Sequence, residues 1–155
     1  MERTTRIRGT AALLGLALAA GLLLAPVASA HPAGPTRVPG PCALTRQDGE
    51  RIQSFSIRLI RCAAAKWPVP GGATKAVCIA RHESGLVPTA TSPSGQYLGL
   101  FQDSKTYWPT NYRHYTYPVW RLKTTALNGR SNAVVSVRMA HNPAVGWRPW
   151  RGTGC

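Results

Sequence analysis

The chain contains few acidic residues. Only 5 Asp and Glu residues stand against 19 Lys and Arg residues, which gives a formal net charge of +14 at pH 7. A surface of this sign attracts polyanions, such as anionic polymers of a cell envelope, lipid headgroups or nucleic acid. The basic residues are scattered along the chain and form no arginine-rich arm. An anionic partner is therefore expected, and any acid–base chemistry has very few carboxyl groups to use.

Long apolar runs are also missing, apart from one near the start. Ala11–Leu24 is apolar over 14 residues, follows three arginines and precedes Ala28-Ser29-Ala30, which has the form of a cleavage site. A membrane-spanning helix needs roughly 20 such residues, so this pattern predicts a secretory signal over residues 1–30. We expect a mature chain of residues 31–155 that is secreted, with no membrane span after signal cleavage.

Removal of that signal leaves four carboxylates. Three arginines and one glutamate lie within residues 1–30, so 16 basic and 4 acidic residues remain, with a net charge of +12. For an exported protein, this charge favours anionic cell-wall polymers as partners over nucleic acid, which is not expected to bind. The remaining acids are Asp48, Glu50, Glu83 and Asp103.

Cysteine is sparse as well, with only Cys42, Cys62, Cys78 and Cys155. An even number of cysteines in an exported chain predicts two disulfides, for which three pairings are possible. We expect Cys62–Cys78, across the turn between two consecutive helices, and Cys42–Cys155, which would join the ends. Because no CxxC pair is present, no metal site is expected, and no cofactor either.

About 125 mature residues are enough for one domain. Residues 31–44 are rich in proline and glycine, which predicts an N-terminal linker before a domain over residues 45–155. Apolar residues at helical spacing predict a helix over 46–66, capped by Thr45, with Asp48 and Glu50 in its first turn.

A second helix is predicted over residues 73–84, and it is apolar on most sides. Glu83 lies at its C-terminal end, where the helix dipole disfavours a negative charge. Burial against an apolar helix tends to raise the pKa of a carboxyl group. A carboxyl group that stays protonated near neutral pH meets the requirement for a general acid.

The segment after this helix is a long loop of small and polar residues, which predicts that it lines a site. Asp103-Ser104 is predicted to cap a short helix that Pro109 ends. Most aromatic side chains between residues 107 and 120 are expected to pack inside the domain. Ser131 is expected to cap a last helix that ends near His141, and two C-terminal indoles are expected to close the core.

Glu83 opens a run of residues at characteristic spacing. The run comprises Glu83-Ser84-Gly85, Pro88, Ala90, Ser92-Pro93, Gly95 and Gly99-Leu100-Phe101-Gln102. Near the end of the chain, Asn132-Ala133 is followed by an apolar helix and by a Gly-Trp pair at 146–147 with Trp150. The run resembles the signature of the soluble lytic transglycosylase group of the lysozyme-like superfamily. The closing segment is similar to that of short secreted bacterial members, and the resemblance covers about residues 50–152.

The resemblance implies a predominantly helical α+β domain with a central helix ending at the catalytic glutamate and a loop-lined cleft. It also implies cleavage of the MurNAc–GlcNAc β-1,4 bonds of peptidoglycan glycan strands. We expect the protein to be a monomer. Glu83 matches the catalytic acid/base of the family. Ser92 and Gln102 match positions that hydrogen-bond the substrate or hold the acid in place, and Tyr97 lies where the loop returns to the cleft.

The product of cleavage is left open by the residues. A lone Glu83 would suit a lytic transglycosylase, which forms 1,6-anhydro ends, whereas Asp103 as a second carboxylate would suit a hydrolytic muramidase. Asp103 stands where the family more often has an apolar residue, and the Ala-Tyr-Asn-Ala-Gly element of larger transglycosylases is absent. We favour transglycosylation. The alternatives are hydrolysis with Asp103, or a non-catalytic cationic wall-binding protein on the same scaffold.

Overall fold

The computed structural model describes residues 39–155, and the predicted signal and most of the predicted linker lie outside this range. The described chain is predominantly helical α+β, as expected. It contains α1 (Ile52–Lys66), α2 (Gly72–Ser84), β1 (Tyr97–Leu98), β2 (Asp103–Ser104), α3 (Trp108–Tyr115), the 3-10 helix η1 (Pro118–Trp120), α4 (Gly129–His141) and the 3-10 helix η2 (Arg148–Thr153).

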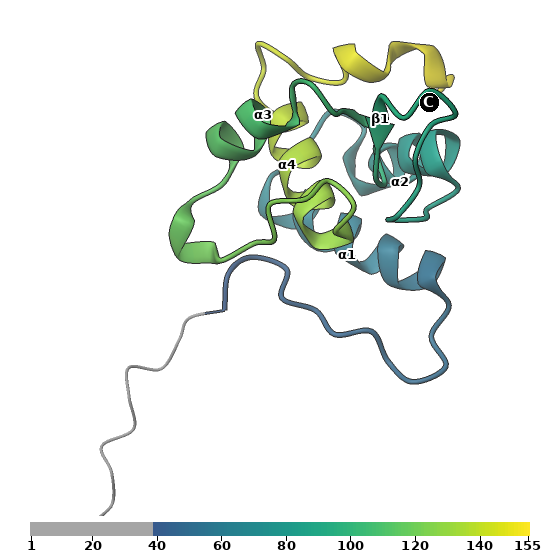
Figure 1. Ribbon diagram of the computed structural model, residues 1–155, viewed down its shortest axis with the longest axis vertical. Coiled ribbons are helices and arrows are strands. Elements are labelled where there is room, and N and C mark those ends of the chain that lie inside the picture. Colours follow the sequence, from purple (N-terminus) through teal and green to yellow (C-terminus); the bar gives the residue numbers. More distant parts are fainter. Residues whose placement is uncertain (1–38) are drawn as a thin grey trace, which may run out of the picture. The chain divides into compact units, whose positions relative to one another are not determined.

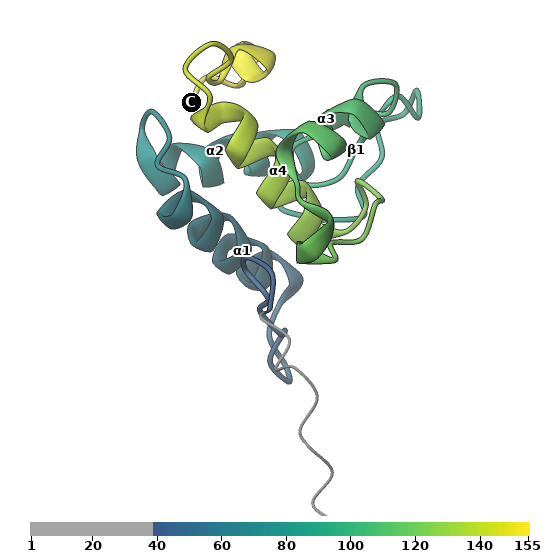
Figure 2. The same ribbon diagram turned by 90° about the vertical axis from the view of Figure 1, so that its left-hand side faces the viewer.

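The core is built around α4, which is buried on nearly all sides. Its residues Val134, Val135 and Val137 are fully enclosed, and so are the polar residues Ser131, Asn132 and Ser136. Helix α4 packs against both α1 and α3, and Figures 1 and 2 both draw it between those two helices. The helix begins at Gly129, and Asn128 is its N-cap and accepts the backbone N–H of Ser131. The predicted cap at Ser131 was therefore wrong.

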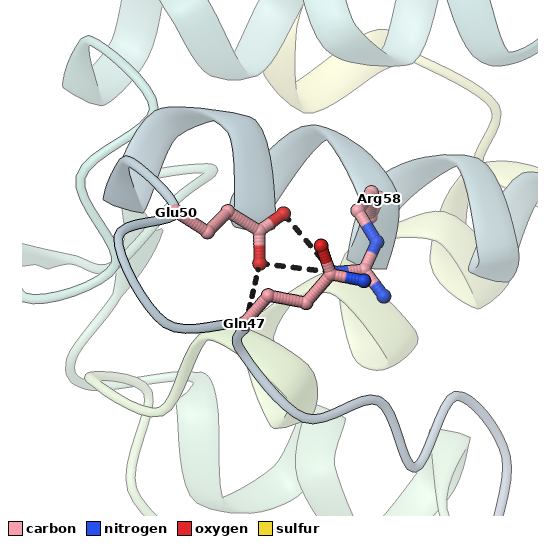
Figure 3. Close-up of polar contacts among 3 residues, drawn as sticks. All are labelled: Gln47, Glu50 and Arg58. Atoms are coloured by element: carbon pink, nitrogen blue, oxygen red, sulfur yellow. Dashed lines mark hydrogen bonds and ion pairs between the residues drawn. The ribbon is translucent and has the colours of Figure 1, made fainter.

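Helix α1 is shorter than predicted. The expected helix over 46–66 begins only at Ile52, so the capping box at Thr45 and Asp48 was wrong. Glu50 instead accepts the backbone N–H of Gln47 at 3.0 Å and two bonds from Arg58 Nη1 at 2.9 and 3.0 Å (Figure 3). The bond from Gln47 is the main cause of a lowered pKa at Glu50, so this side chain is a structural anion that ties the preceding turn to α1.

The disulfides are Cys42–Cys62 and Cys78–Cys155. The predicted pairs Cys62–Cys78 and Cys42–Cys155 were wrong. Helices α1 and α2 do pack against each other, but their cysteines are reached by different segments. The chain before α1 reaches Cys62, and the chain after η2 reaches Cys78. Helix α1 is thus linked to the segment before it and α2 to the C-terminal end of the chain, and the two helices are not linked to each other.

The end of the expected linker packs against the domain. Cys42 is buried, and the backbone carbonyl of Pro41 accepts a 2.8 Å hydrogen bond from Arg130 Nε on α4. A Cβ atom at Gly40 would collide with the backbone of Trp120. Residues 39–44 therefore lie against the folded domain.

The two strands form a short antiparallel sheet in which Tyr97 pairs with Ser104 and Leu98 with Asp103. Asp103-Ser104 was predicted to cap a helix, and this prediction was wrong because the segment is a strand. Pro109 lies in the first turn of α3 and does not end it. A proline is tolerated there because the first backbone N–H groups of a helix need no intrahelical acceptor.

Aromatic side chains close the core near the C-terminal segment, as expected. Phe101 is stacked on Trp147 and makes an edge contact with Trp150. Trp150 Nε1 donates a 2.6 Å hydrogen bond to the Phe101 carbonyl, so the buried indole has its polar atom satisfied. Among residues 39–155, every helix is too short or too polar to cross a membrane.

Candidate active site

The C-terminal end of α2 places Glu83 beside the loop. The helix ends at Gly85, whose φ of +62° lies in the left-handed region. The N–H groups of Gly85 and Leu86 return to the carbonyls of Arg81 and Ala80, which is the pattern of a Schellman cap. Ala80 is buried, whereas Glu83 is only partly buried. The helix is therefore anchored by its apolar face, and its last turn leaves the Glu83 carboxyl at the surface of a cleft.

Ser84 joins the end of this helix to the returning chain. Its hydroxyl lies 3.0 Å from the Ala80 carbonyl and 2.8 Å from the Leu100 carbonyl. The role of Ser84 is therefore structural. It fixes the position of Glu83 relative to the segment that carries Gln102 and Asp103.

The loop from Gly85 to Gly99 turns back on itself through Ser92. The Ser92 hydroxyl accepts the Tyr97 N–H at 3.1 Å and lies 3.2 Å from the Ser94 hydroxyl. The Ser92 backbone N–H also donates to the Tyr97 carbonyl at 2.9 Å. Ser92 therefore shapes the hairpin that presents Tyr97, whose side chain is 50% exposed.

Gln102 joins two parts of this loop, at Ala90 and at Gly99. Its Nε2 donates to the carbonyls of Gly99, at 2.9 Å, and Ala90, at 3.3 Å. Its φ of +50° lies in the left-handed region, which non-glycine residues rarely adopt. Strain of this kind persists only where the surroundings fix the backbone, and here the amide contacts do so.

Asp103 is the most buried acid of the site, with 4% of its surface exposed. Its Oδ2 accepts hydrogen bonds from Ser136 Oγ at 2.7 Å and from Asn132 Nδ2 at 3.0 Å, both on α4. Asn132 also accepts the Phe101 N–H at 2.9 Å. A single amide of the central helix thus holds both the backbone before β2 and the Asp103 carboxylate.

These side chains meet in one cleft of about 840 Å³. All five predicted site residues line it, namely Glu83, Ser92, Tyr97, Gln102 and Asp103. The cleft is also lined by residues that the sequence did not predict as site residues, among them Tyr107, Asn111, Met139 and Trp150. Tyr107 is 67% exposed, whereas the adjacent Trp108 is buried. No periodicity distinguishes the two rings, so only the fold identifies Tyr107 as a cleft residue.

Burial controls the protonation of both carboxyl groups in the cleft. It raises the pKa of Glu83, and the charge of His82 opposes this shift. Burial raises the pKa of Asp103 to about 7, against the hydrogen bonds from Ser136 and Asn132 and with a further contribution from the charge of Glu83. The cleft can therefore retain a protonated carboxyl group at a higher pH than an exposed acid would allow.

Within residues 39–155, one group of side chains has the composition of a metal site. The ligand atoms of Cys78, His82 and Cys155 lie within 4.8 Å of one another. The two sulfurs are joined in a disulfide, whereas a metal would need them as thiolates. This group therefore does not fit a metal ion in the oxidised protein.

No protein-family model, curated protein or solved structure matches the chain. The chemistry of the cleft therefore rests on its own geometry. A partly buried carboxyl group faces an open cleft lined by hydroxyls, an amide and exposed tyrosine rings. This arrangement can donate a proton to a bound neutral polar molecule.

Proposed function

We propose that the protein is a secreted glycosidase of the lysozyme-like fold that cleaves the MurNAc–GlcNAc β-1,4 bonds of peptidoglycan, with Glu83 as general acid and base. One observation carries this proposal. The residues that resemble the lytic transglycosylase signature, Glu83, Ser92 and Gln102, line one cleft, although up to 19 positions separate them in the sequence.

The size and lining of the cleft support a glycan as substrate. A volume of about 840 Å³ lies within the range of pockets that enclose extended small ligands. The exposed rings of Tyr97 and Tyr107 provide flat apolar faces with polar edges, which suit the faces of sugar rings. Ser92 and Ser104 add hydroxyl groups along the same surface.

In the proposed reaction, the protonated Glu83 carboxyl donates its proton to the glycosidic oxygen while the bond to the anomeric carbon breaks. The leaving sugar departs as an alcohol, and an oxocarbenium-like centre forms on the muramyl residue. The ionised Glu83 then takes the proton of the muramyl 6-hydroxyl as that oxygen attacks the anomeric carbon. The product has a 1,6-anhydro end, and Glu83 is protonated again.

The surroundings of Asp103 favour this one-carboxylate route. A second carboxylate in a hydrolase has to reach the anomeric carbon or an attacking water. Asp103 is 4% exposed, and its Oδ2 is occupied by Ser136 and Asn132. Hydrolysis with Asp103 as the second carboxylate is the alternative, because Asp103 does line the cleft.

The first test compares the substitution Glu83→Gln with Asp48→Asn in purified mature protein acting on cell-wall suspensions. Both substitutions replace a carboxyl group by an amide of nearly the same shape, but Asp48 is exposed and lies outside the cleft. Loss of a general acid costs about 10²- to 10⁴-fold in rate. Glu83→Gln is therefore expected to lose wall lysis with an unchanged circular dichroism spectrum, and Asp48→Asn to keep it. Wall lysis by Glu83→Gln at the wild-type rate would refute the proposal.

Mass analysis of the released muropeptides identifies the reaction type. Transglycosylation leaves ends that are one water lighter than those left by hydrolysis. A non-catalytic cationic binder would release no new chain ends at all. New ends of normal mass would favour hydrolysis with Asp103.

A further inference from the structure

Neither the fold nor the proposed reaction requires an acid at position 103. Asp103 pairs with Leu98 through its backbone, which any residue could do. Its side chain is buried between the small sheet and α4, where an unpaired charge is costly. A buried carboxyl group that does not take part in the reaction needs another explanation.

The two oxygens of this carboxyl group differ in their surroundings. Both donors, Ser136 Oγ and Asn132 Nδ2, bind Oδ2. Among the described residues, no protein group donates a hydrogen bond to Oδ1. Because Asp103 lines the same cleft as Glu83, Oδ1 is the oxygen left to face the cleft. Helix α4 thus holds the carboxyl group through Oδ2 and leaves Oδ1 on the side of the cleft.

Few other charges act on the two carboxyl groups. The titratable side chains that line the cleft are Glu83, Asp103, Tyr97 and Tyr107. Helix α2 adds the charge of His82 near Glu83. Helix α4 and the C-terminal segment present only neutral side chains to the cleft or to Asp103, namely Asn132, Ser136, Met139, Pro149 and Trp150. The charge of Glu83 therefore raises the pKa of Asp103 without an opposing cation from α4 or the C-terminal segment.

We propose that Asp103 and Glu83 form a coupled carboxyl pair that shares one proton, in which Asp103 is a positioning residue that keeps a proton available to Glu83 at neutral pH. Its catalytic meaning rests on the proposed function of Glu83. The pair itself is a statement about two side chains in one cleft, and it can be tested without any substrate.

Repulsion between like charges in one low-dielectric site explains why the two carboxyl groups would share a proton. Once one carboxyl group ionises, its charge opposes ionisation of the other, so the two protons leave in separate steps that belong to the pair. Burial already raises the pKa of Glu83, and burial together with the Glu83 charge raises that of Asp103 to about 7. The last proton of the pair is thus expected to leave near pH 7.

The test follows the Glu83 side-chain carboxyl by carbon-13 NMR during a pH titration, with Glu83→Gln used to assign its signal. Asp103→Asn keeps a carbonyl oxygen that can accept from Ser136 and Asn132, but it removes the titrating group. The wild-type Glu83 signal is expected to titrate in two steps, the upper one near pH 7. In Asp103→Asn only the lower step is expected, and in the control Asp48→Asn both steps are expected to remain.

A second variant covers the case in which Asp103→Asn does not fold. Ser136→Ala removes a donor that stabilises the ionised form of Asp103, so it is expected to move the upper step of the Glu83 signal to higher pH. A wild-type Glu83 signal with a single step would overturn the proposal. So would a folded Asp103→Asn that keeps the upper step, or an unmoved upper step in Ser136→Ala.

The activity profile supplies a separate readout. In Asp103→Asn the alkaline limb of the pH profile of glycan cleavage is expected to move to lower pH. At a fixed pH on that limb, the rate is expected to fall about tenfold for each pH unit by which the limb moves. If Glu83→Gln still cleaves walls, the proposed function fails while the titration still decides the pair. If Glu83→Gln is inactive but the alkaline limb of Asp103→Asn does not move, the proposed function stands and the proposed carboxyl pair is refuted.

Discussion

At the scale of single residues, the motif side chains mainly shape the loop. Ser92 and Gln102 hydrogen-bond to loop backbone atoms, and among the described residues neither bonds to Glu83. Their spacing is therefore explained by loop geometry. The sequence motif therefore encodes the shape of the loop that lines the cleft beside Glu83.

Gly99 is the residue where this geometry is tightest. Its φ is +81°, and an added Cβ would collide with the Ala126 carbonyl and with the Asn132 side chain. Gly99→Ala is expected to destabilise the fold by about 4 kcal/mol, from backbone strain and overpacking together. Gly95 has a similar φ of +70°, but a Cβ added there would meet no atom within 4 Å, so Gly95→Ala should cost about 1 kcal/mol from strain alone.

Urea denaturation of the two glycine variants measures these costs. Because both carry the same substitution at a similar φ, the difference between them isolates the contact with Asn132 and Ala126. Equal losses of unfolding free energy in the two variants would show that the close approach at Gly99 contributes nothing.

At the scale of elements, the helical spacing of apolar residues predicted a helix that packs in the core. Helix α2 was predicted over 73–84 and lies at Gly72–Ser84, because its small apolar residues and terminal glycine act locally. The start of α1 was not predictable in this way. Glu50 pairs with Arg58, eight residues away, and no local pattern in the sequence reveals that partner.

Asp103 and the cysteines depend on contacts between distant segments. Asp103-Ser104 reads as a helix cap locally, but its partners are Asn132 and Ser136, which only the folded chain brings close. The cysteine pairing likewise depends on which segment covers each helix face. Four of the five cleft residues are thus predicted by resemblance, and Asp103 as the carboxyl group that directly follows Gln102. The contacts that support these residues are not predicted.

The two disulfides should stabilise the fold to different extents. In the chain-entropy treatment, the cross-link over 77 residues between Cys78 and Cys155 contributes about 4 kcal/mol, and the one over 20 residues between Cys42 and Cys62 about 3 kcal/mol. Replacing each pair by alanine and measuring guanidinium denaturation tests this order.

The paired alanine variants control for each other, because each removes two sulfurs and one cross-link. The order would be contradicted if loss of Cys42–Cys62 proved the more destabilising. That result would mean that the packing of residues 39–44 depends on the cross-link more than loop length alone implies.

At the scale of the whole molecule, the excess of basic residues should govern attachment to the wall. Screening shortens the reach of surface charges from about 10 Å at 0.1 M salt to about 3 Å at 1 M. Binding of the Glu83→Gln variant to intact walls is therefore expected to weaken steadily as salt is added, as measured by co-sedimentation. Walls stripped of anionic polymers provide the control and should show weak binding with little salt dependence. Equal binding to both kinds of wall would contradict an electrostatic attachment.

The order of the disulfides along the chain has a consequence for biogenesis. The first cysteine pairs with the second and the third with the fourth. A chain that enters an oxidising compartment from its N-terminus exposes Cys42 and Cys62 before either later cysteine arrives. Pairing each newly arrived cysteine with the one still free then gives the native connectivity directly. Such a protein would mature with an oxidant alone and would not need a disulfide isomerase to correct its pairing.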